Sequence, residues 1–242
     1  MYPGSKNGKP VFRQYSKKQK ITNDCPFCVE YSQLEESQYY IEAGKKIGHS
    51  SRILLETDNW YVIPTMGSLT VGYVLLVAKE HYLSLANLSA ELLLEMLKLK
   101  QKVEDIIFKH LGKNCIAFEH GVTNAYSSGA NSVDHIHLHI VPVEKPMWDS
   151  VLQTMPKAAY VVTDSFITLH EQWQVQMPNS YLLFQDIDQK IHYLSDASNM
   201  PSQLFRKCLA AHLGADCWDW RKEVYLDNLR KTLELFSTAG GL

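Results

Sequence analysis

Apolar residues follow two different periods along the first half of the chain. Residues 52–65 and 72–81 are apolar strings rich in Val, Ile, Tyr and Leu, separated by small and polar residues. This pattern is typical of an antiparallel pair or meander of strands. Residues 88–112 instead repeat Leu, Met, Val and Ile at spacings of three and four, which predicts a long helix that begins after Ser89 and ends at Gly112.

A second group of predicted strands follows this helix. Residues 115–121 are mostly apolar, residues 122–132 are polar and rich in Gly, Ser and Asn, and the next ten residues alternate again. The elements therefore come in the order strand pair, helix, strand, loop and strand, with Pro142 ending the last strand. This order predicts a compact fold of the α+β class.

The pattern changes on either side of this module. Residues 1–24 are polar and basic and predict an extended arm, so we assign the module to residues 25–150 and a C-terminal extension to residues 151–242. In the extension, two apolar stretches suggest further strands, at residues 159–173 and 180–194. Two stretches with helical spacing suggest terminal helices, at residues 202–214 and 222–236.

The bulk composition narrows the classes of function. The chain is 45% hydrophobic and 21% charged, as in an ordinary soluble globular protein. Its formal net charge of -2 argues against broad electrostatic capture of nucleic acid or of an anionic membrane, so we expect neither as a partner. The N-terminal residues carry charge but no apolar signal-peptide core, and no run is long enough to span a bilayer. We expect a cytoplasmic protein.

Three histidines occupy every second position in the stretch "NSVDHIHLHIVP": His135, His137 and His139. Alternate residues of a strand point to one face, so the three imidazoles share a side while Ile136 and Leu138 pack on the other. Two chemical interpretations follow. The histidines could bind a catalytic zinc with an open position, or the central imidazole could attack phosphorus between histidines that donate to phosphate oxygens.

The loop before the histidines favours the nucleophile. It supplies hydroxyl, amide and unhindered backbone donors directly beside the predicted strand, from Ser128, Gly129, Asn131 and Ser132. Such donors suit a phosphate or a developing phosphorane. An ordinary tight connection is the alternative.

The five cysteines include one close pair. An odd number of cysteines does not predict a disulfide framework, and the motif "CPFC" places two residues between Cys25 and Cys28. The pair could be half of a zinc site, a thioredoxin-like redox pair or two unrelated thiols. No helical pattern begins at Cys28 within a βαβ unit, which weakens the redox interpretation.

The motif "HIHLHIV" resembles the signature of the histidine triad (HIT) superfamily of nucleotidyl hydrolases and transferases. The order of elements over residues 25–145 is similar to that fold, so the resemblance implies a five-stranded antiparallel sheet with a long helix, and a catalytic domain at residues 25–150. It also implies that His137 attacks the α-phosphorus of a nucleotide and that His139 contacts the phosphate. Asn131 and Ser132 occupy the positions of the family's polar residues before the triad.

The resemblance also implies a metal site. In zinc-containing members, including the galactose-1-phosphate uridylyltransferase branch, a Cys-x-x-Cys pair binds zinc with a histidine after a strand and with the first triad histidine. Here these are Cys25, Cys28, His81 and His135. Four protein ligands would make one closed, structural zinc per chain. His135 would then anchor the metal and leave His137 free to attack.

We therefore expect a hydrolase that cleaves the α-phosphorus bond of a small-molecule nucleotide conjugate, such as a dinucleoside polyphosphate or a nucleoside phosphoramidate. Ser132 is expected to assist catalysis, and Ser128, Gly129 and Asn131 to bind substrate. The first alternative is a nucleotidyltransferase or phosphorylase with the same nucleophile. The second is a non-catalytic nucleotide-binding module that keeps the zinc. A homodimer is compatible with the sequence.

The cluster "WDWR" at residues 218–221 combines two aromatic rings with a guanidinium. It could pack at the start of a helix, or it could stack on a base or bind a phosphate.

Overall fold

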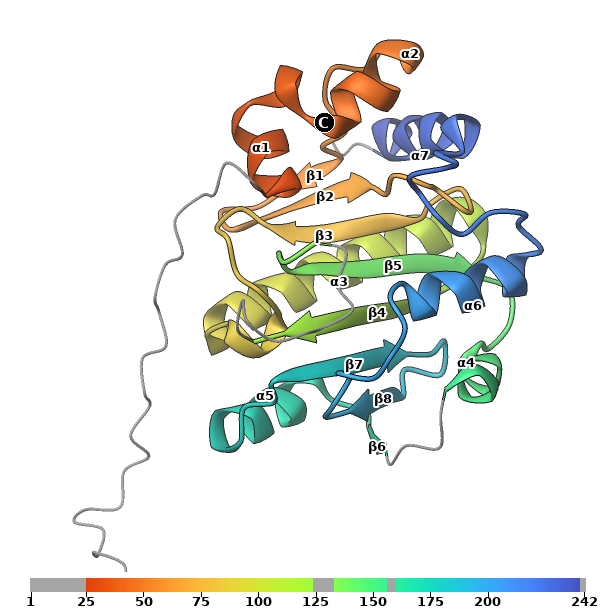
Figure 1. The fold of residues 1–242 in the computed structure, drawn as a ribbon. Helices are drawn as coiled ribbons and strands as arrows, with labels where there is room; N and C mark the ends of the chain where they lie inside the picture. The colour runs from red at the N-terminus through yellow and green to blue at the C-terminus, as the bar shows by residue number, and fades with distance from the viewer. Residues whose placement is uncertain (1–24, 124–132, 156–159, 240–242) are drawn as a thin grey trace, which may run out of the picture.

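The computed structural model describes residues 25–123, 133–155 and 160–239. In this part of the chain, the strands form one antiparallel sheet in the order β1-β2-β3-β5-β4-β7-β8-β6 (Figure 1). Their bounds are β1 Leu55–Glu56, β2 Trp60–Pro64, β3 Val74–Ala78, β4 Asn114–Val122, β5 His137–Val143, β6 Val161–Thr163, β7 Ser180–Gln185 and β8 Ile191–Leu194.

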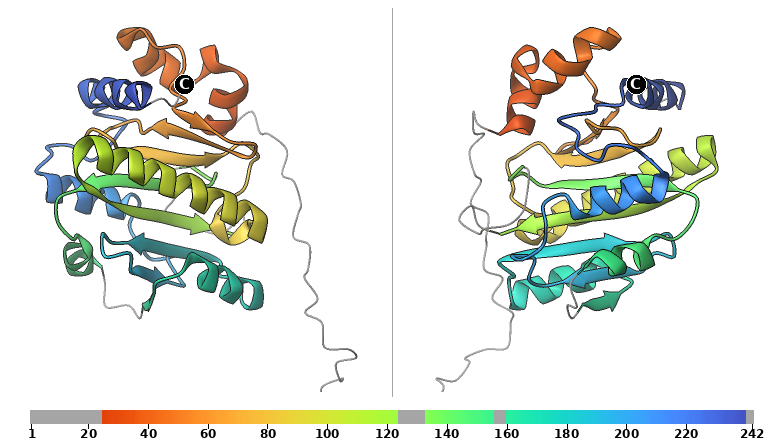
Figure 2. Two further views of the ribbon diagram at one scale, coloured as in Figure 1. Left: turned by 180° about the vertical axis from the view of Figure 1, so that it is seen from behind. Right: turned by 45° about the vertical axis from the view of Figure 1, so that its right-hand side comes forward.

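Helices cover both faces of this sheet. Their bounds are α1 Pro26–Ser32, α2 Lys45–Ile47, α3 Ala90–Leu111, α4 Trp148–Thr154, α5 Phe166–Val175, α6 Leu204–Leu213 and α7 Leu226–Thr238, with short turns at η1 Leu34–Glu36, η2 Tyr40–Gly44 and η3 Leu85–Asn87. Figure 2 shows α3 lying across one face and α6 lying on the opposite face. No helix in the described ranges is both long enough and apolar enough to cross a membrane.

The first five strands confirm the predicted antiparallel sheet. β2 and β3 form the expected hairpin, and β5 lies between β3 and β4, so His139 is opposite Leu75 on one side and Phe118 on the other. The histidine strand is therefore central. Leu138 and Ile140 point into the core beneath α3, while Val141 and Val143 belong to the core beneath α4 and α6.

The long helix confirms the predicted capping residues. The Ser89 side chain accepts a hydrogen bond from the Leu92 backbone N–H, which satisfies one of the unpaired donors of the first turn. Gly112 ends the helix with φ 65°, and its N–H bonds to the Phe108 carbonyl oxygen. This left-handed conformation costs glycine little because it has no Cβ.

The C-terminal extension continues the same sheet. β7 pairs with β4 from Ala117↔Gln185 to Val122↔Ser180, so the strands of the extension lengthen the sheet beyond β4. The two predicted terminal helices are α6 and α7. The prediction of strand across residues 159–173 is wrong beyond Thr163, because residues 166–175 form α5. The division into domains at residue 150 stays a prediction.

Helix α5 forms although the composition of residues 166–175 favours a strand. Ser165 caps it by accepting from the Thr168 N–H. Its buried residues are spaced by three and four, as a helix requires: Phe166, Leu169, His170 and Trp173. The aromatic and β-branched residues in this stretch favour a strand, and burial at helical spacing overrides that preference.

Candidate functional site

Four side chains meet beside the start of β5. Cys25 precedes α1, Cys28 lies in it, His81 follows β3 and His135 precedes β5. All four are buried, and one ligand atom from each lies within 4.8 Å of every other. The Nδ1 atom of His135 is 3.3 Å from the Cys25 Sγ atom and 3.6 Å from the Cys28 Sγ atom, and the Nδ1 atom of His81 is 3.4 Å from the Cys28 Sγ atom. The cluster unites the residues that the sequence predicted as metal ligands.

This geometry fits a structural zinc. Zn–S bonds of about 2.3 Å and Zn–N bonds of about 2.0 Å in a tetrahedron place sulfur and nitrogen roughly 3.5 Å apart, as they are here. The Nε2 atom of His135 lies 2.9 Å from the Ala78 carbonyl oxygen. A carbonyl only accepts, so Nε2 carries the proton and the Nδ1 lone pair faces the two thiols. Such a second hydrogen bond is the usual support of a metal-binding histidine.

Helix α1 corrects one expectation about the cysteine pair. The sequence showed no helical pattern at Cys28, yet the helix begins at Pro26, between the two cysteines. Proline favours the first turn of a helix because its missing N–H would be unpaired there. The neighbouring strands in the sheet are antiparallel, so no βαβ unit accompanies the pair. The four predicted metal ligands instead connect α1 to the end of β3, through His81, and to the start of β5, through His135.

His137 begins β5 and points into a pocket. Its Nδ1 atom is 2.6 Å from the His135 carbonyl oxygen, so Nδ1 donates and the lone pair of the ring is on Nε2. Burial lowers the pKa of His137 to about 4. The imidazole is therefore neutral near pH 7, with an unprotonated nitrogen available to attack an electrophile.

His139 has the opposite tautomer. Its Nδ1 atom is 2.7 Å from the Tyr73 hydroxyl, and that hydroxyl accepts a hydrogen bond of 3.3 Å from the Arg206 Nη1 group. Because Arg206 can only donate, His139 Nδ1 is the acceptor available to the Tyr73 O–H among the described residues, which places the proton of His139 on Nε2. Burial lowers the pKa of His139 well below its ordinary value, with smaller contributions from His137 and Arg206. A neutral N–H donor thus lies beside the His137 ring, at a ring-centroid distance of 5.0 Å.

The pocket in front of these histidines is lined from several elements. Phe27 comes from α1, His120 from β4, and Arg206 and Trp220 from the C-terminal extension. The Phe27 ring lies 5.3 Å from the His137 ring, and Phe118 stacks on His139 at 4.4 Å with an angle of 14°. The other aromatic residues that line the pocket are Tyr39 and Phe205. Apolar and aromatic walls around a few polar groups are typical of a small-molecule site.

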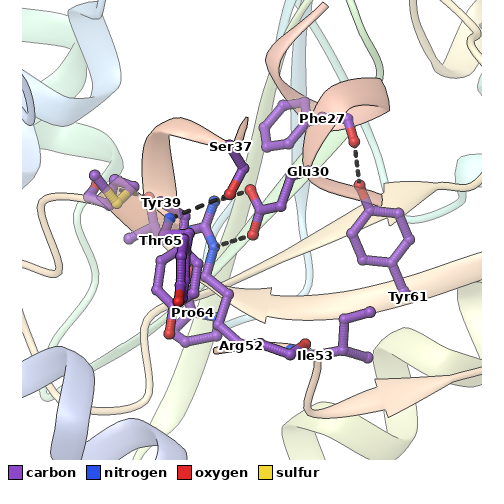
Figure 3. A network of polar contacts seen from close by, with 12 residues as sticks. Phe27, Glu30, Ser37, Tyr39, Arg52, Ile53, Tyr61, Pro64 and Thr65 are labelled. Atoms are coloured by element: carbon purple, nitrogen blue, oxygen red, sulfur yellow. Dashed lines mark hydrogen bonds and ion pairs between the residues drawn. The ribbon is translucent and has the colours of Figure 1, made fainter. Parts of the chain in front are cut away.

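A buried ion pair fixes the N-terminal wall of the pocket. Figure 3 shows Arg52 and Glu30 side by side, with hydrogen bonds of 2.6 and 2.7 Å between the guanidinium and the carboxylate. Arg52 also donates to the Pro64 carbonyl oxygen, at the end of β2, and its guanidinium lies 4.9 Å from the Tyr39 ring centroid. These contacts tie α1 and η2 to the sheet.

Part of the predicted site lies outside the described residues. This holds for the loop residues expected to bind substrate or assist catalysis: Ser128, Gly129, Asn131 and Ser132. The residues of the 218–221 cluster have different environments in the structure. Trp220 lines the pocket, whereas the exposed Arg221 pairs with the Asp219 carboxylate at 2.8 Å, so this arginine has a structural partner.

The sequence analysis gave no role to three residues of the site: His120 and Arg206, which line the pocket, and Tyr73, which contacts His139. His120 and Phe118 are two apart on β4, so strand alternation could have placed His120 on the same face as the triad. Its Nε2 atom is buried without a hydrogen-bond partner among the described residues, and burial lowers its pKa to about 4. Tyr73 and Arg206 gave no such signal, because their contact joins residues 133 positions apart.

Comparison with known families identifies one domain. The family model described as HIT domain matches residues 37–145. A search of curated proteins finds no match.

The similar solved structures are distant. A HIT-like protein involved in cell-cycle regulation from Bartonella henselae is 19% identical over 52% of this chain and 83% of that chain, with a TM-score of 0.38. A zinc-bound histidine triad family protein from Mycobacterium smegmatis is 20% identical over 42% of this chain and 73% of that one, with a TM-score of 0.32.

The yeast Ap4A phosphorylase Apa2, solved in complex with AMP, is 14% identical over 60% of this chain and 58% of that chain, with a TM-score of 0.35. The alignment thus spans less than two thirds of the yeast enzyme. None of these three proteins is described as a galactose-1-phosphate uridylyltransferase. The expected similarity to that branch stays a prediction.

Proposed function

Residues 37–145 of this chain match the HIT domain family, and from this premise we propose that the protein is an enzyme that cleaves the α-phosphorus bond of a nucleotide conjugate, with His137 as the nucleophile. The observation that carries the proposal is the hydrogen bond from His137 Nδ1 to the His135 carbonyl oxygen, which leaves the Nε2 lone pair in the pocket. A neutral imidazole with this tautomer can attack phosphorus near pH 7.

The first step forms a bond from His137 Nε2 to the α-phosphorus and breaks the bond to the leaving group, which departs with its electron pair. Positive charge develops on the His137 ring, and the His135 carbonyl oxygen that accepts from Nδ1 stabilises it. The N–H of His139 donates to a phosphate oxygen. In the second step the oxygen of water bonds to phosphorus and its proton passes to solvent, while the bond from phosphorus to His137 Nε2 breaks with its electron pair returning to nitrogen, which releases the nucleoside monophosphate and restores neutral His137.

The zinc cluster has a positioning role in this proposal. Zinc held by Cys25, Cys28, His81 and His135 would be a closed structural site that supplies no open coordination position. His135 is two residues before the nucleophile and its carbonyl oxygen holds the His137 ring. The metal ligands therefore fix the tautomer and the direction of the nucleophile.

The pocket suits a nucleotide. Aromatic side chains such as Phe27 and Trp220 can stack on a base, and polar groups near the histidines can meet the phosphate. The proposal keeps the sequence-based expectation that Ser128, Gly129 and Asn131 bind substrate and that Ser132 assists catalysis. The acceptor in the second step is water, which makes the enzyme a hydrolase.

Turnover of a substrate panel tests this proposal. Dinucleoside polyphosphates and nucleoside phosphoramidates are incubated with wild type, His137→Asn and His110→Asn, the last of which changes an exposed histidine at the end of α3. We expect His137→Asn to lose roughly a thousandfold or more in kcat/KM, because no other group replaces the nucleophile. His110→Asn should keep full activity.

The products separate the related functions. Nucleoside monophosphate formed in water alone indicates hydrolysis, whereas turnover that requires added phosphate or a sugar phosphate indicates a phosphorylase or transferase. Nucleotide binding without turnover of any donor would overturn the proposal and leave a binding module.

A further inference from the structure

A buried arginine of the C-terminal extension reaches His139 from the wall of the pocket, through Tyr73. Arg206 lies in α6 and is 5% exposed. Its guanidinium donates to three neutral oxygens, which are the Tyr73 hydroxyl at 3.3 Å, the Gly67 carbonyl at 2.8 Å and the Trp218 carbonyl at 3.2 Å. No ion pair involving Arg206 is found among the described residues. Its charge is therefore directed at Tyr73 and two backbone carbonyls, without a carboxylate to neutralise it.

The second buried arginine of the pocket differs in this respect. Arg52 is 3% exposed, and the Glu30 carboxylate neutralises it through two hydrogen bonds. A buried charge is costly to maintain without a counter-charge, so a position that keeps one requires a reason beyond packing. At Arg206 that reason is its hydrogen bond to Tyr73, which in turn contacts His139.

We propose that Arg206 is a positioning residue for catalysis: through Tyr73 it holds the proton of His139 on Nε2, where it faces the phosphate. Arg206 donates to the Tyr73 oxygen, and among the described residues His139 Nδ1 is the acceptor within hydrogen-bond distance of the Tyr73 proton, so the hydroxyl donates to His139. A hydrogen bond from a cation polarises the O–H group and strengthens its donation. The inference rests on the proposed role of His139 in the reaction.

The loop between β2 and β3 is shaped to admit Arg206. Gly67 has φ 66°, and a Cβ atom there would lie 2.7 Å from Arg206 Nη2 and 2.5 Å from Trp220 Cβ. Only glycine allows this approach at that backbone conformation. The extension also holds the loop at two points, since the Ser68 N–H donates to the Val224 carbonyl oxygen and the Gly72 N–H donates to Thr232 Oγ1 at 2.9 Å.

Helix α6 also reaches His139 by a second path. Phe205, next to Arg206, packs at 5.2 Å against Phe118, which stacks on the His139 ring. The ring of His139 is thus held on its face through Phe118 and at Nδ1 through Tyr73. Both supports depend on residues of the C-terminal extension, which completes the catalytic site of the HIT domain.

Kinetics of Arg206 and Tyr73 variants test the inference. Arg206→Met removes the donor and the charge, Tyr73→Phe removes the hydroxyl, and Arg206→Lys keeps a charged donor. We expect each of the first two to lower kcat by roughly 10- to 100-fold with little change in KM, as losses of supporting hydrogen bonds do. Arg206→Lys should recover part of the loss. Arg230→Gln, on the exposed face of α7, should leave kcat unchanged.

Two further readouts separate positioning from a structural role. The double variant Arg206→Met/Tyr73→Phe should be no slower than the slower single variant, because both changes break one chain of hydrogen bonds. Nitrogen NMR of labelled histidine should show His139 protonated on Nε2 in the wild type, and a mixture of tautomers in either single variant.

The NMR measurement needs no turnover, so it decides the inference even where the proposed reaction fails. An unchanged His139 tautomer in folded Arg206→Met, or unchanged kcat in Tyr73→Phe, would overturn it. Additive losses in the double variant would also overturn it, because they would show that the two residues act independently.

Discussion

The three histidines of the motif differ because the Nδ1 atom of each has a different partner. In His135 it faces the cysteine thiols, in His137 it donates to a carbonyl oxygen, and in His139 it accepts from Tyr73. Strand alternation predicted that the three side chains share a face. It could not predict the tautomers, because two of these partners are distant in the sequence.

Glu119 is a buried acid on β4, on the face of the sheet opposite the histidines, and its protonation gives a second prediction for a single residue. Glu119 is 2% exposed, accepts from the Leu85 N–H at 3.0 Å and accepts from the Tyr181 hydroxyl. Burial raises its pKa from 4.5 to about 8. The folded protein therefore holds this proton more tightly than the unfolded chain does. The contribution of Glu119 to the free energy of unfolding is therefore fully present below about pH 4.5. It is lost as the pH rises from there to about 8, because the unfolded chain ionises first.

We expect Glu119→Gln to remove this pH dependence. Over the range from pH 5 to pH 8, the wild type should lose a few kcal/mol of unfolding free energy relative to the variant, since each pKa unit corresponds to about 1.4 kcal/mol. Urea denaturation of both proteins at several pH values measures the difference. A difference that stays constant with pH would show that Glu119 is ionised in the folded state.

At the scale of elements, prediction succeeded where the signal was local. Helix α3 has its cap, its apolar spacing and its terminal glycine within one stretch of sequence. Helix α1 lacks such a signal, because it has 7 residues and is held by Cys28 and the Arg52–Glu30 pair rather than by its own propensity. Helices this short need tertiary contacts.

Loss of a zinc ligand should therefore release α1. We expect about one zinc per chain in the purified wild type, and loss of that metal in Cys28→Ser. We expect the variant to lose at least about 3 kcal/mol of unfolding free energy, which should lower its Tm by roughly 6–12 °C. Metal analysis and thermal denaturation check this, with Cys217→Ser as the control, since Cys217 lies outside the cluster. A metal-free native protein of unchanged Tm would contradict the assignment.

At the scale of the whole molecule, the extension is joined to the predicted catalytic domain through shared structure. β4 has β5 on one side and β7 on the other, and Arg206 and Trp220 line the pocket. The sequence predicted an α+β extension but not its pairing with β4, because strand order depends on contacts between distant segments. The predicted boundary at residue 150 lies in α4, between β5 and the strands of the extension that continue the same sheet.

Truncation after residue 150 tests that boundary. We expect the fragment to be insoluble or unfolded, because it leaves the edge of β4 unpaired and uncovers the apolar face beneath α6. In the full chain, circular dichroism and tryptophan fluorescence should report one coincident urea transition. A folded, soluble fragment of residues 25–150 would instead show that the extension is a separate unit.

The most direct test of the account is detection of the nucleotide on His137. Wild-type protein is mixed with a donor, quenched in base within the first turnover, and analysed by intact mass and peptide mapping. We predict an added nucleoside monophosphate on the peptide that contains His137, absent in His137→Asn and present in His110→Asn. Turnover by the wild type with no adduct at any quench time, together with an active His137→Asn variant, would contradict the proposed mechanism.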